Sequence, residues 1–248
     1  MKPILVIGDT CSDVFFYGTC ERLAPDSPVP VLDIVKQEKT LGMAGNVYRN
    51  IIDLDFPCEI VTNNNYHEIT KTRYVDIKTN HMFIRIDSQA EYSPIDRQTL
   101  EALPWDHCSA VVISDYDKGF LSEKDIQYIA EHHPLTFLDT KKVLGEWAND
   151  ITFIKINRKE YRASLKCLTP RLQLKIIETL GADGCKYLEQ IFPVKLVEIK
   201  NLSGAGDSFL AGLAVSFVKT ENMNIAIPFA NSVATKVVQK LGIGTIKG

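Results

Sequence analysis

A glycine-rich turn followed by an aspartate is the segment of this chain best suited to chemistry. Residues 201–214 read NLSGAGDSFLAGLA, so a small, flexible turn opens a strongly helical apolar stretch with Asp207 in its first turn. Backbone N–H groups at a helix N-terminus bind anions, and small side chains let a phosphate approach them closely. A carboxylate beside such a turn has the arrangement that phosphoryl transfer to a hydroxyl requires. The alternative role for Asp207 is that of a helix cap.

Five further segments place glycine or polar residues directly after apolar runs or at the start of helices. They read GDTCSD at residues 8–13, TLGMAGNV at 40–47, SDYDKG at 114–119, NRKE at 157–160 and ETLGADG at 178–184. The first segment puts two carboxylates, Asp9 and Asp13, after the first apolar run. A single Gly-x-Gly-Asp turn is weak evidence for phosphoryl transfer, and these further segments strengthen it.

Short β-branched runs alternate with amphipathic stretches along most of the chain. Strands are expected at Ile4–Ile7, Ala110–Ser114, Thr136–Asp139 and Ile151–Ile156, and helices at Ala44–Leu54, Glu123–His132 and Arg158–Leu165. Near-continuous apolar strands that alternate with helices predict a parallel sheet covered on both faces. The sequence therefore predicts an α/β fold, with a single domain over residues 1–248.

Two regions contain short strands with no helix between them. They are Val14–Tyr17 with Val29–Val35, and Lys71–Ile77 with Met82–Ile86. Because ligands of open α/β sheets bind at the carboxyl ends of the strands, we expect residues 14–37 and 71–87 to form a small lid over that end. The alternative is that these strands extend the main sheet. Exposed strand edges are often covered by pairing, so a homodimer through the lid is also expected.

Taken in order, these segments resemble the ribokinase-like, PfkB-type carbohydrate kinases over nearly the whole chain, ending with FANSVA at residues 229–234. Within that family the chain is most similar to bacterial heptose-7-phosphate kinases, in the form of the kinase domain of the bifunctional ADP-heptose synthesis enzyme. Residues 8–18, 22–31 and 114–119 carry this narrower likeness. The resemblance implies a ribokinase-like three-layer sandwich with a mainly parallel central sheet and a small β-strand lid.

The resemblance also implies an activity. The chain would transfer the γ-phosphoryl group of ATP, with Mg²⁺, to a hydroxyl of a sugar or sugar phosphate. The expected acceptor is the C1 hydroxyl of D-glycero-D-manno-heptose 7-phosphate, in lipopolysaccharide precursor biosynthesis.

Individual residues receive roles from the same resemblance. Asp207 would be the base that takes the proton from the sugar hydroxyl, and the backbone of Gly204, Ala205 and Gly206 would form the anion hole. The expected substrate-binding residues are Asp13, Gly42, Asn46, Asp115 and Lys118. The expected nucleotide-binding residues are Asn157, Glu160, Thr179, Gly181, Gly184 and Asn231. Asn157 and Glu160 form the N-x-x-E motif, which would hold Mg²⁺ through water. For Lys118 the alternative is a solvated surface residue.

Composition narrows the range of partners. The 248 residues are 45% hydrophobic and 24% charged, with a formal net charge of -3, so no broad basic face for nucleic acid or anionic lipid is expected. No apolar run approaches the ~20 residues that span a bilayer. The six cysteines show no Cys-x-x-Cys pair, which favours reduced thiols in the cytoplasm over a zinc site or a disulfide framework.

Two other functions stay open at this point. One is a kinase for nucleosides or other small molecules on the same scaffold. The other is a non-catalytic relative that binds sugar or nucleotide, against which the presence of Asp207, Asn157 and Glu160 argues.

Overall fold

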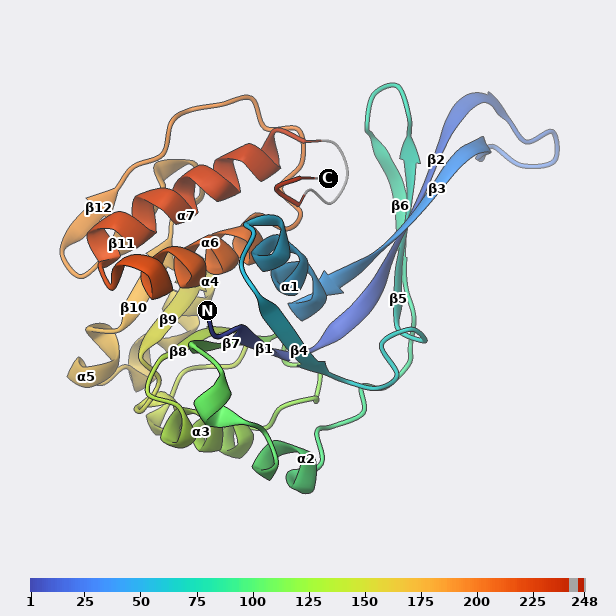
Figure 1. Cartoon of the computed structure of the whole chain (residues 1–248). Helices are drawn as coiled ribbons and strands as arrows, with labels where there is room; N and C mark the ends of the chain where they lie inside the picture. Colours follow the sequence, from blue (N-terminus) through green and yellow to red (C-terminus); the bar gives the residue numbers. More distant parts are fainter. Residues whose placement is uncertain (241–244, 248) are drawn as a thin grey trace.

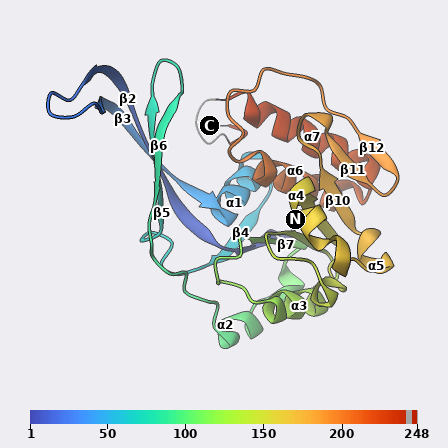
Figure 2. The ribbon, with the colours of Figure 1, turned by 180° about the vertical axis from the view of Figure 1, so that it is seen from behind.

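The computed structural model describes residues 1–240 and 245–247, with an eight-stranded sheet at its centre (Figures 1 and 2). Its order is β12 (Gln190–Phe192), β11 (Cys185–Tyr187), β10 (Ile176–Thr179), β9 (Phe153–Asn157), β8 (Thr136–Thr140), β7 (Ala110–Asp115), β1 (Ile4–Gly8) and β4 (Cys58–Thr62). The strands from β10 to β4 pair in parallel, whereas β11 and β12 pair antiparallel. The predicted, mainly parallel sheet is confirmed.

Helices cover both faces of this sheet because the central strands are apolar on both sides. In β1, Ile4 and Val6 pack in one buried cluster, and Leu5 and Ile7 pack in another. The first cluster includes residues of α1 (Ala44–Asp53), α6 (Ala205–Thr220) and α7 (Met223–Val238). The second includes residues of α2 (Arg97–Glu101), α3 (Glu123–His132), α4 (Arg158–Ser164) and α5 (Pro170–Gln173). Short 3-10 turns lie at Trp105–His107, Glu146–Ala148, Leu165–Cys167 and Gly181–Asp183.

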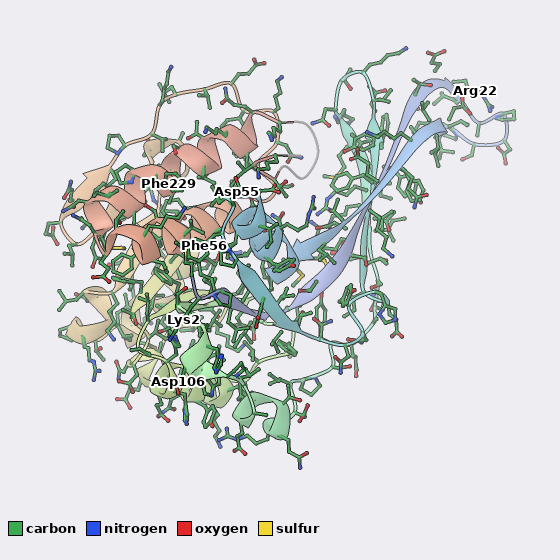
Figure 3. The ribbon with its side chains drawn as sticks, viewed as in Figure 1. Lys2, Arg22, Asp55, Phe56, Asp106 and Phe229 are labelled. Carbon is green, nitrogen blue, oxygen red and sulfur yellow. The ribbon has the colours of Figure 1, made fainter. Side chains whose placement is uncertain are left out.

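A separate four-stranded sheet stands beside the main body, and we call it the lid sheet (Figure 1). Its order is β3 (Pro30–Met43), β2 (Thr10–Leu23), β5 (Thr70–Asp76) and β6 (Met82–Asp87). Only Asp9 separates β1 from β2, so the first core strand leads directly into the lid sheet. Arg22 lies towards the outer end of the arm that β2 and β3 form (Figure 3).

Local sequence signals account for several helix boundaries. Ser122 and Asp125 form a capping box at the start of α3, which occupies the expected residues. Gly204, with φ 84°, immediately precedes α6, and a residue with a Cβ would be strained in this left-handed conformation. Strand β9 begins at Phe153 and not at Ile151, because the Ile151 N–H donates to the Ala148 carbonyl in the preceding turn. Among the described residues, no helix is long and apolar enough to cross a bilayer.

Candidate active site

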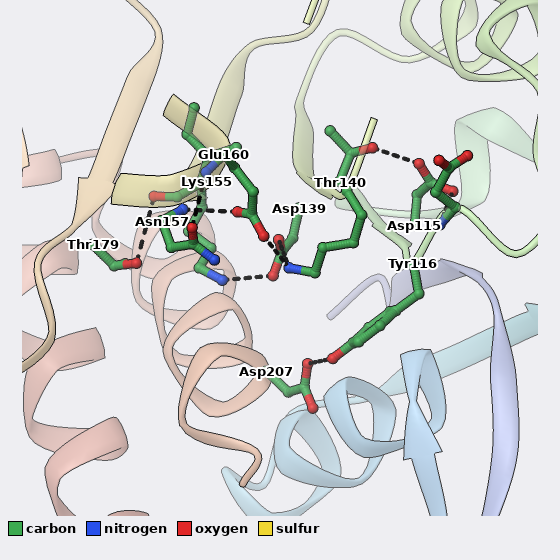
Figure 4. A network of polar contacts seen from close by, with 12 residues as sticks. Asp115, Tyr116, Asp139, Thr140, Lys155, Asn157, Glu160, Thr179 and Asp207 are labelled. Atoms are coloured by element: carbon green, nitrogen blue, oxygen red, sulfur yellow. Dashed lines mark hydrogen bonds and ion pairs between the residues drawn. The ribbon is translucent and has the colours of Figure 1, made fainter. Parts of the chain in front are cut away.

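Asp207 lies in the first turn of α6, with both carboxylate oxygens held by other elements. Figure 4 shows the contact between Asp207 and Tyr116. The Tyr116 hydroxyl donates to Oδ1 at 2.6 Å, and the Asn46 amide donates to Oδ2 at 2.9 Å. Asn46 belongs to α1, and Tyr116 directly follows β7. The Asp207 side chain therefore sits where three segments that are distant in the sequence meet. Asn46 was expected to bind the sugar, and in the structure its amide contacts Asp207 directly. Tyr116 was not singled out by the sequence.

Burial raises the pKa of Asp207 above its usual value. The hydrogen bonds from Asn46 and Tyr116 lower that pKa, the nearby Asp139 carboxylate raises it, and the Lys155 ammonium lowers it. A carboxylate with a raised pKa is a stronger proton acceptor in its ionised form, which is the property a general base needs. Asp207 retains 6% exposure, so it is nearly enclosed.

A buried pair of opposite charges lies behind the glycine turn. Lys155 of β9 and Asp139 of β8 are direct cross-strand neighbours, and their Nζ and Oδ2 atoms are 2.6 Å apart. A Cβ on Gly206 would lie 2.9 Å from Lys155 Nζ, so the ammonium faces the glycine turn. Lys155 was not predicted from the sequence, although one lysine inside the apolar run FIKI is the signal that marks it.

A second lysine continues this charged network. Lys141 Nζ is 2.5 Å from Glu160 Oε1 and 3.6 Å from Asp139 Oδ1. Burial lowers the pKa of Lys141, but the surrounding carboxylates outweigh it and the net pKa lies well above the usual value for lysine. Lys141 therefore stays charged at neutral pH, and it links Glu160 to the buried Asp139–Lys155 pair.

Asn157 and Glu160 form a capping box at the start of α4. The Asn157 Oδ1 atom accepts from the backbone N–H groups of Lys159 and Glu160, and Glu160 Oε2 accepts from the Asn157 N–H. No group of three or more His, Cys, Asp or Glu within the described ranges could hold a metal directly. Mg²⁺ keeps several waters and is often held by one carboxylate together with substrate phosphates. The two residues therefore fit the water-mediated role, and their capping bonds fix where they lie.

A cavity at the N-terminus of α6 brings together most of the residues expected to bind the nucleotide. Its wall includes Thr179, Gly181, Gly184, Ala205, Gly206 and Asn231. Much of the remaining wall is apolar, with Val194, Phe209 and Val238 among its residues. Gly184 has φ 90°, and a Cβ there would lie 2.0 Å from the Phe192 carbonyl oxygen. Asn231 donates from Nδ2 to that same carbonyl oxygen at 3.0 Å, so it joins α7 to the end of β12.

Two of the expected sugar-binding residues meet at the base of the lid sheet. Asp13 of β2 and Gly42 of β3 approach so closely that a Cβ on Gly42 would lie 2.1 Å from Asp13 Oδ2. From the sequence, Gly42 belongs to a glycine-containing segment at the start of a helix, where a turn was expected. The structure corrects this: β3 continues to Met43, because it pairs with β2 through to Thr10. Arg73 of β5 forms an ion pair with Asp13 through Nη1 and Oδ1. Arg73 was not predicted from the sequence.

Asp115 and Lys118 differ in how free their side chains are. The Asp115 carboxylate is fully buried and bonds to Lys142 Nζ at 2.8 and 3.0 Å and to the Thr140 hydroxyl. Lys118 is exposed and lines a second cavity that includes Lys71, Ser88 and other residues at the base of the lid sheet. The structure thus places Asp115 in the supporting framework and Lys118 at an open surface.

Curated relatives match almost the whole chain. The bifunctional protein HldE of Helicobacter pylori (strain HPAG1) is 30% identical over 296 residues, covering 98% of this chain and 64% of the relative. HldE of a Nitratiruptor species is 30% identical over 297 residues, covering 99% of this chain and 63% of the relative. The chain therefore spans slightly less than two thirds of the length of these relatives.

Solved structures and a family model agree with this match. Ribokinase from Thermotoga maritima superposes with a TM-score of 0.71 at 18% identity, covering 98% of this chain and 95% of the other. The nucleoside kinase of Methanocaldococcus jannaschii gives 0.68 at 17% identity, with 98% and 93% covered. These likenesses confirm the ribokinase-like fold. The model of the pfkB family carbohydrate kinases matches residues 107–247, more than half of the sequence. The chain accordingly belongs to the pfkB family of carbohydrate kinases, which are phosphotransferases that act on an alcohol group.

Proposed function

We propose that this chain transfers the γ-phosphoryl group of ATP to a sugar hydroxyl, with Asp207 as the general base. The observation that carries the proposal is the position of the Asp207 carboxylate. Asp207 lies in the first turn of α6, directly after Ala205 and Gly206, and these two residues line the apolar cavity. A nucleotide in that cavity would present its terminal phosphate to the turn, and a sugar at the base of the lid sheet would present its hydroxyl to Asp207.

The proposed reaction uses a base, an anion-binding turn with a nearby lysine, and a pair of residues for Mg²⁺. Asp207 accepts the hydroxyl proton while the hydroxyl oxygen bonds to the γ-phosphorus, and the bond from that phosphorus to the ADP oxygen breaks. The backbone N–H groups at the start of α6 and the Lys155 ammonium stabilise charge on the phosphoryl oxygens. Asn157 and Glu160 would hold the waters of Mg²⁺, which when bound neutralises charge on the nucleotide phosphates.

For the acceptor, we propose D-glycero-D-manno-heptose 7-phosphate, phosphorylated at C1. Support comes from the HldE relatives at about 30% identity along almost the whole chain. It also comes from the SDYDKG segment, whose Lys118 lies with Lys71 at an open cavity near the lid sheet. The wall also contains Asp87 and Glu91, so the two ammonium groups would contact the phosphate of an acceptor only at their own side of the cavity. Lipopolysaccharide precursor biosynthesis is the proposed context, and the cytoplasm, where ATP is available, is the proposed location.

A panel of acceptors tests the substrate. The purified chain is incubated with ATP, Mg²⁺ and either heptose 7-phosphate, ribose, fructose 6-phosphate or adenosine, and the product phosphate is located by ³¹P and ¹³C NMR. We expect the highest kcat/KM for the heptose phosphate, with the new phosphate on C1. A preference for adenosine would favour a nucleoside kinase. Nucleotide binding without transfer to any acceptor would indicate a non-catalytic relative.

We further propose a homodimer through the lid sheet. Its outer strands expose large apolar side chains, among them Ile34, Val35, Ile84 and Ile86, each at least 50% exposed. Exposed apolar residues on edge strands are commonly covered by another chain. Light scattering at micromolar concentration is expected to give twice the mass of one chain. The mass of a monomer would contradict the proposal.

A further inference from the structure

Tyr116 joins the catalytic carboxylate to two other parts of the molecule. Its hydroxyl donates to Asp207 Oδ1 at 2.6 Å, and its backbone N–H donates to Asp9 Oδ2 at 2.6 Å. Asp9 lies at the junction of β1 and β2 and is fully buried. The residue is thus fixed at its main chain by the core and reaches the base with its side chain (Figure 4).

Two lysines hold the Tyr116 ring from different elements. The Lys71 ammonium, from β5 of the lid sheet, lies 5.5 Å from the ring centroid, and the Lys141 ammonium lies 5.4 Å from it. Cations at these distances are attracted to the face of an aromatic ring. Because both contacts use the ring and not the hydroxyl, they restrict the orientation in which the hydroxyl meets Asp207.

The direction of the hydrogen bond follows from the chemistry of the two groups. Burial raises the pKa of Tyr116 well above the usual value for tyrosine, and the nearby Asp207 carboxylate has the second largest effect in the same direction. The phenol is therefore neutral at physiological pH and donates its proton in this contact. It favours the ionised form of Asp207, which is the form that accepts a proton.

We propose that Tyr116 is a positioning residue that locks the Asp207 carboxylate in one orientation and keeps it ready to accept the proton of the substrate hydroxyl. The inference rests on the proposed function and adds a residue to it. Tyr116 occupies Oδ1 and Asn46 occupies Oδ2. Each carboxylate oxygen has two acceptor sites, so one site on each stays available to the substrate. Neither contact alone would prevent the carboxylate from rotating about its Cβ–Cγ bond.

Other charged and titratable groups also face Asp207, and none of them duplicates the Tyr116 contact. Asp139 of β8 and Lys155 of β9 act on Asp207 with opposite signs, and Cys11 of β2 and Lys141 lie close enough to be affected by its charge. These groups stay in place when only the Tyr116 hydroxyl is removed. The effect of that removal on Asp207 can therefore be measured by itself.

Tyr116→Phe removes the hydroxyl and keeps the ring between its two lysines. Protein labelled at the aspartate Cγ with ¹³C is titrated by NMR, with the Asp207 signal assigned by its loss in Asp207→Asn. We expect the Asp207 midpoint to rise by about one pH unit in Tyr116→Phe, because a hydrogen bond to a charged group is lost. The acidic limb of kcat/KM for the best acceptor should move by the same amount. The nucleotide Kd should not change, since Tyr116 is not among the residues lining the apolar cavity.

A matched control and a second variant complete the design. Tyr128→Phe changes a tyrosine of α3 whose ring stacks on His132, away from Asp207, and should leave both profiles unchanged. If Tyr116→Phe does not fold, 3-fluorotyrosine introduced at position 116 keeps the hydroxyl as a stronger donor and should move the Asp207 midpoint downwards.

The outcomes separate the two proposals. An unmoved Asp207 midpoint and pH profile in Tyr116→Phe, with Asp207→Asn inactive, would overturn the role of Tyr116 and leave the proposed function standing. Full activity of Asp207→Asn would overturn both.

Discussion

Replacing Asp139 by asparagine would leave two lysines without their shared carboxylate. Asp139 and Lys155 are each 5% exposed at the side chain, and Asp139 Oδ2 lies 2.6 Å from Lys155 Nζ. Lys141 Nζ lies 3.6 Å from the other carboxylate oxygen. After the substitution, Lys155 would remain buried beside the positive end of α6, where a second positive charge is unfavourable. Lys141 would retain Glu160 as a partner.

The size of the effect follows from this burial. Removing one partner of a buried ion pair costs about 3–5 kcal/mol of unfolding free energy. At ~2–4 °C per kcal/mol for a chain of this size, the midpoint of thermal unfolding should fall by about 6–20 °C. The loss of stability in Lys155→Met should lie at the lower end of this range. Asp139 keeps Lys141 nearby in that variant, and a cation is removed from the α6 terminus. The double variant should return to within ~1–2 kcal/mol of the wild type, since neither member of the pair is then left alone.

Activity separates the two roles of this pair. Equilibrium urea unfolding followed by circular dichroism gives the stability of the wild type, both single variants and the double variant. Turnover at saturating substrate is measured in parallel. The double variant should recover stability and still lose about 10²-fold in turnover, because the proposed anion-binding turn has lost the Lys155 charge. Wild-type stability in Asp139→Asn would refute the reasoning about the pair, and wild-type turnover in the double variant would refute the role of Lys155.

Three further predictions concern other parts of the site. Gly42→Ala should raise the sugar KM at least ~10-fold, by pushing the Asp13 carboxylate out of place, while calorimetry shows an unchanged nucleotide Kd. Gly184→Ala should lower the unfolding free energy by at least ~1–3 kcal/mol and weaken the thermal stabilisation by ATP, because φ is 90° there and its Cβ would meet the Phe192 carbonyl. Burial raises the pKa of Asp9 from 3.8 to about 6, so the folded state binds more protons than the unfolded state between these values. The stability of the wild type relative to Asp9→Asn should therefore fall by about 2–3 kcal/mol from pH 4 to pH 6.5, and a flat difference in urea unfolding would contradict this.

The core elements could be predicted from the sequence because their signals are local. Helix α3 covers the expected residues since a capping box and His133-Pro134 bound it, and β1 and β7 read as unbroken apolar runs. The strands of the lid sheet were expected to be much shorter. Strand β2 extends over 14 residues because β3 and β5 pair with it on either side, which its own pattern does not reveal.

The part of the candidate site that rests on a local motif could be predicted, whereas the part that rests on tertiary pairing could not. Gly204, Gly206 and Asp207 form a contiguous motif, so their joint position could be read directly. Tyr116 and Asp207 are 91 positions apart, and their contact depends on the order of strands in the sheet. The Asp139–Lys155 pair likewise requires the register of β8 on β9. Contacts of this kind follow from tertiary pairing, and no local spacing encodes them.

The most direct test of the proposed mechanism is the turnover of Asp207→Asn with ATP, Mg²⁺ and the preferred acceptor, together with the nucleotide Kd by calorimetry. Asparagine keeps the shape of the side chain and removes its ability to accept the hydroxyl proton. We expect a loss in kcat of ~10²–10⁴ with nucleotide affinity preserved, while the exposed control Asp106→Asn stays fully active. Wild-type turnover in Asp207→Asn would contradict the central claim.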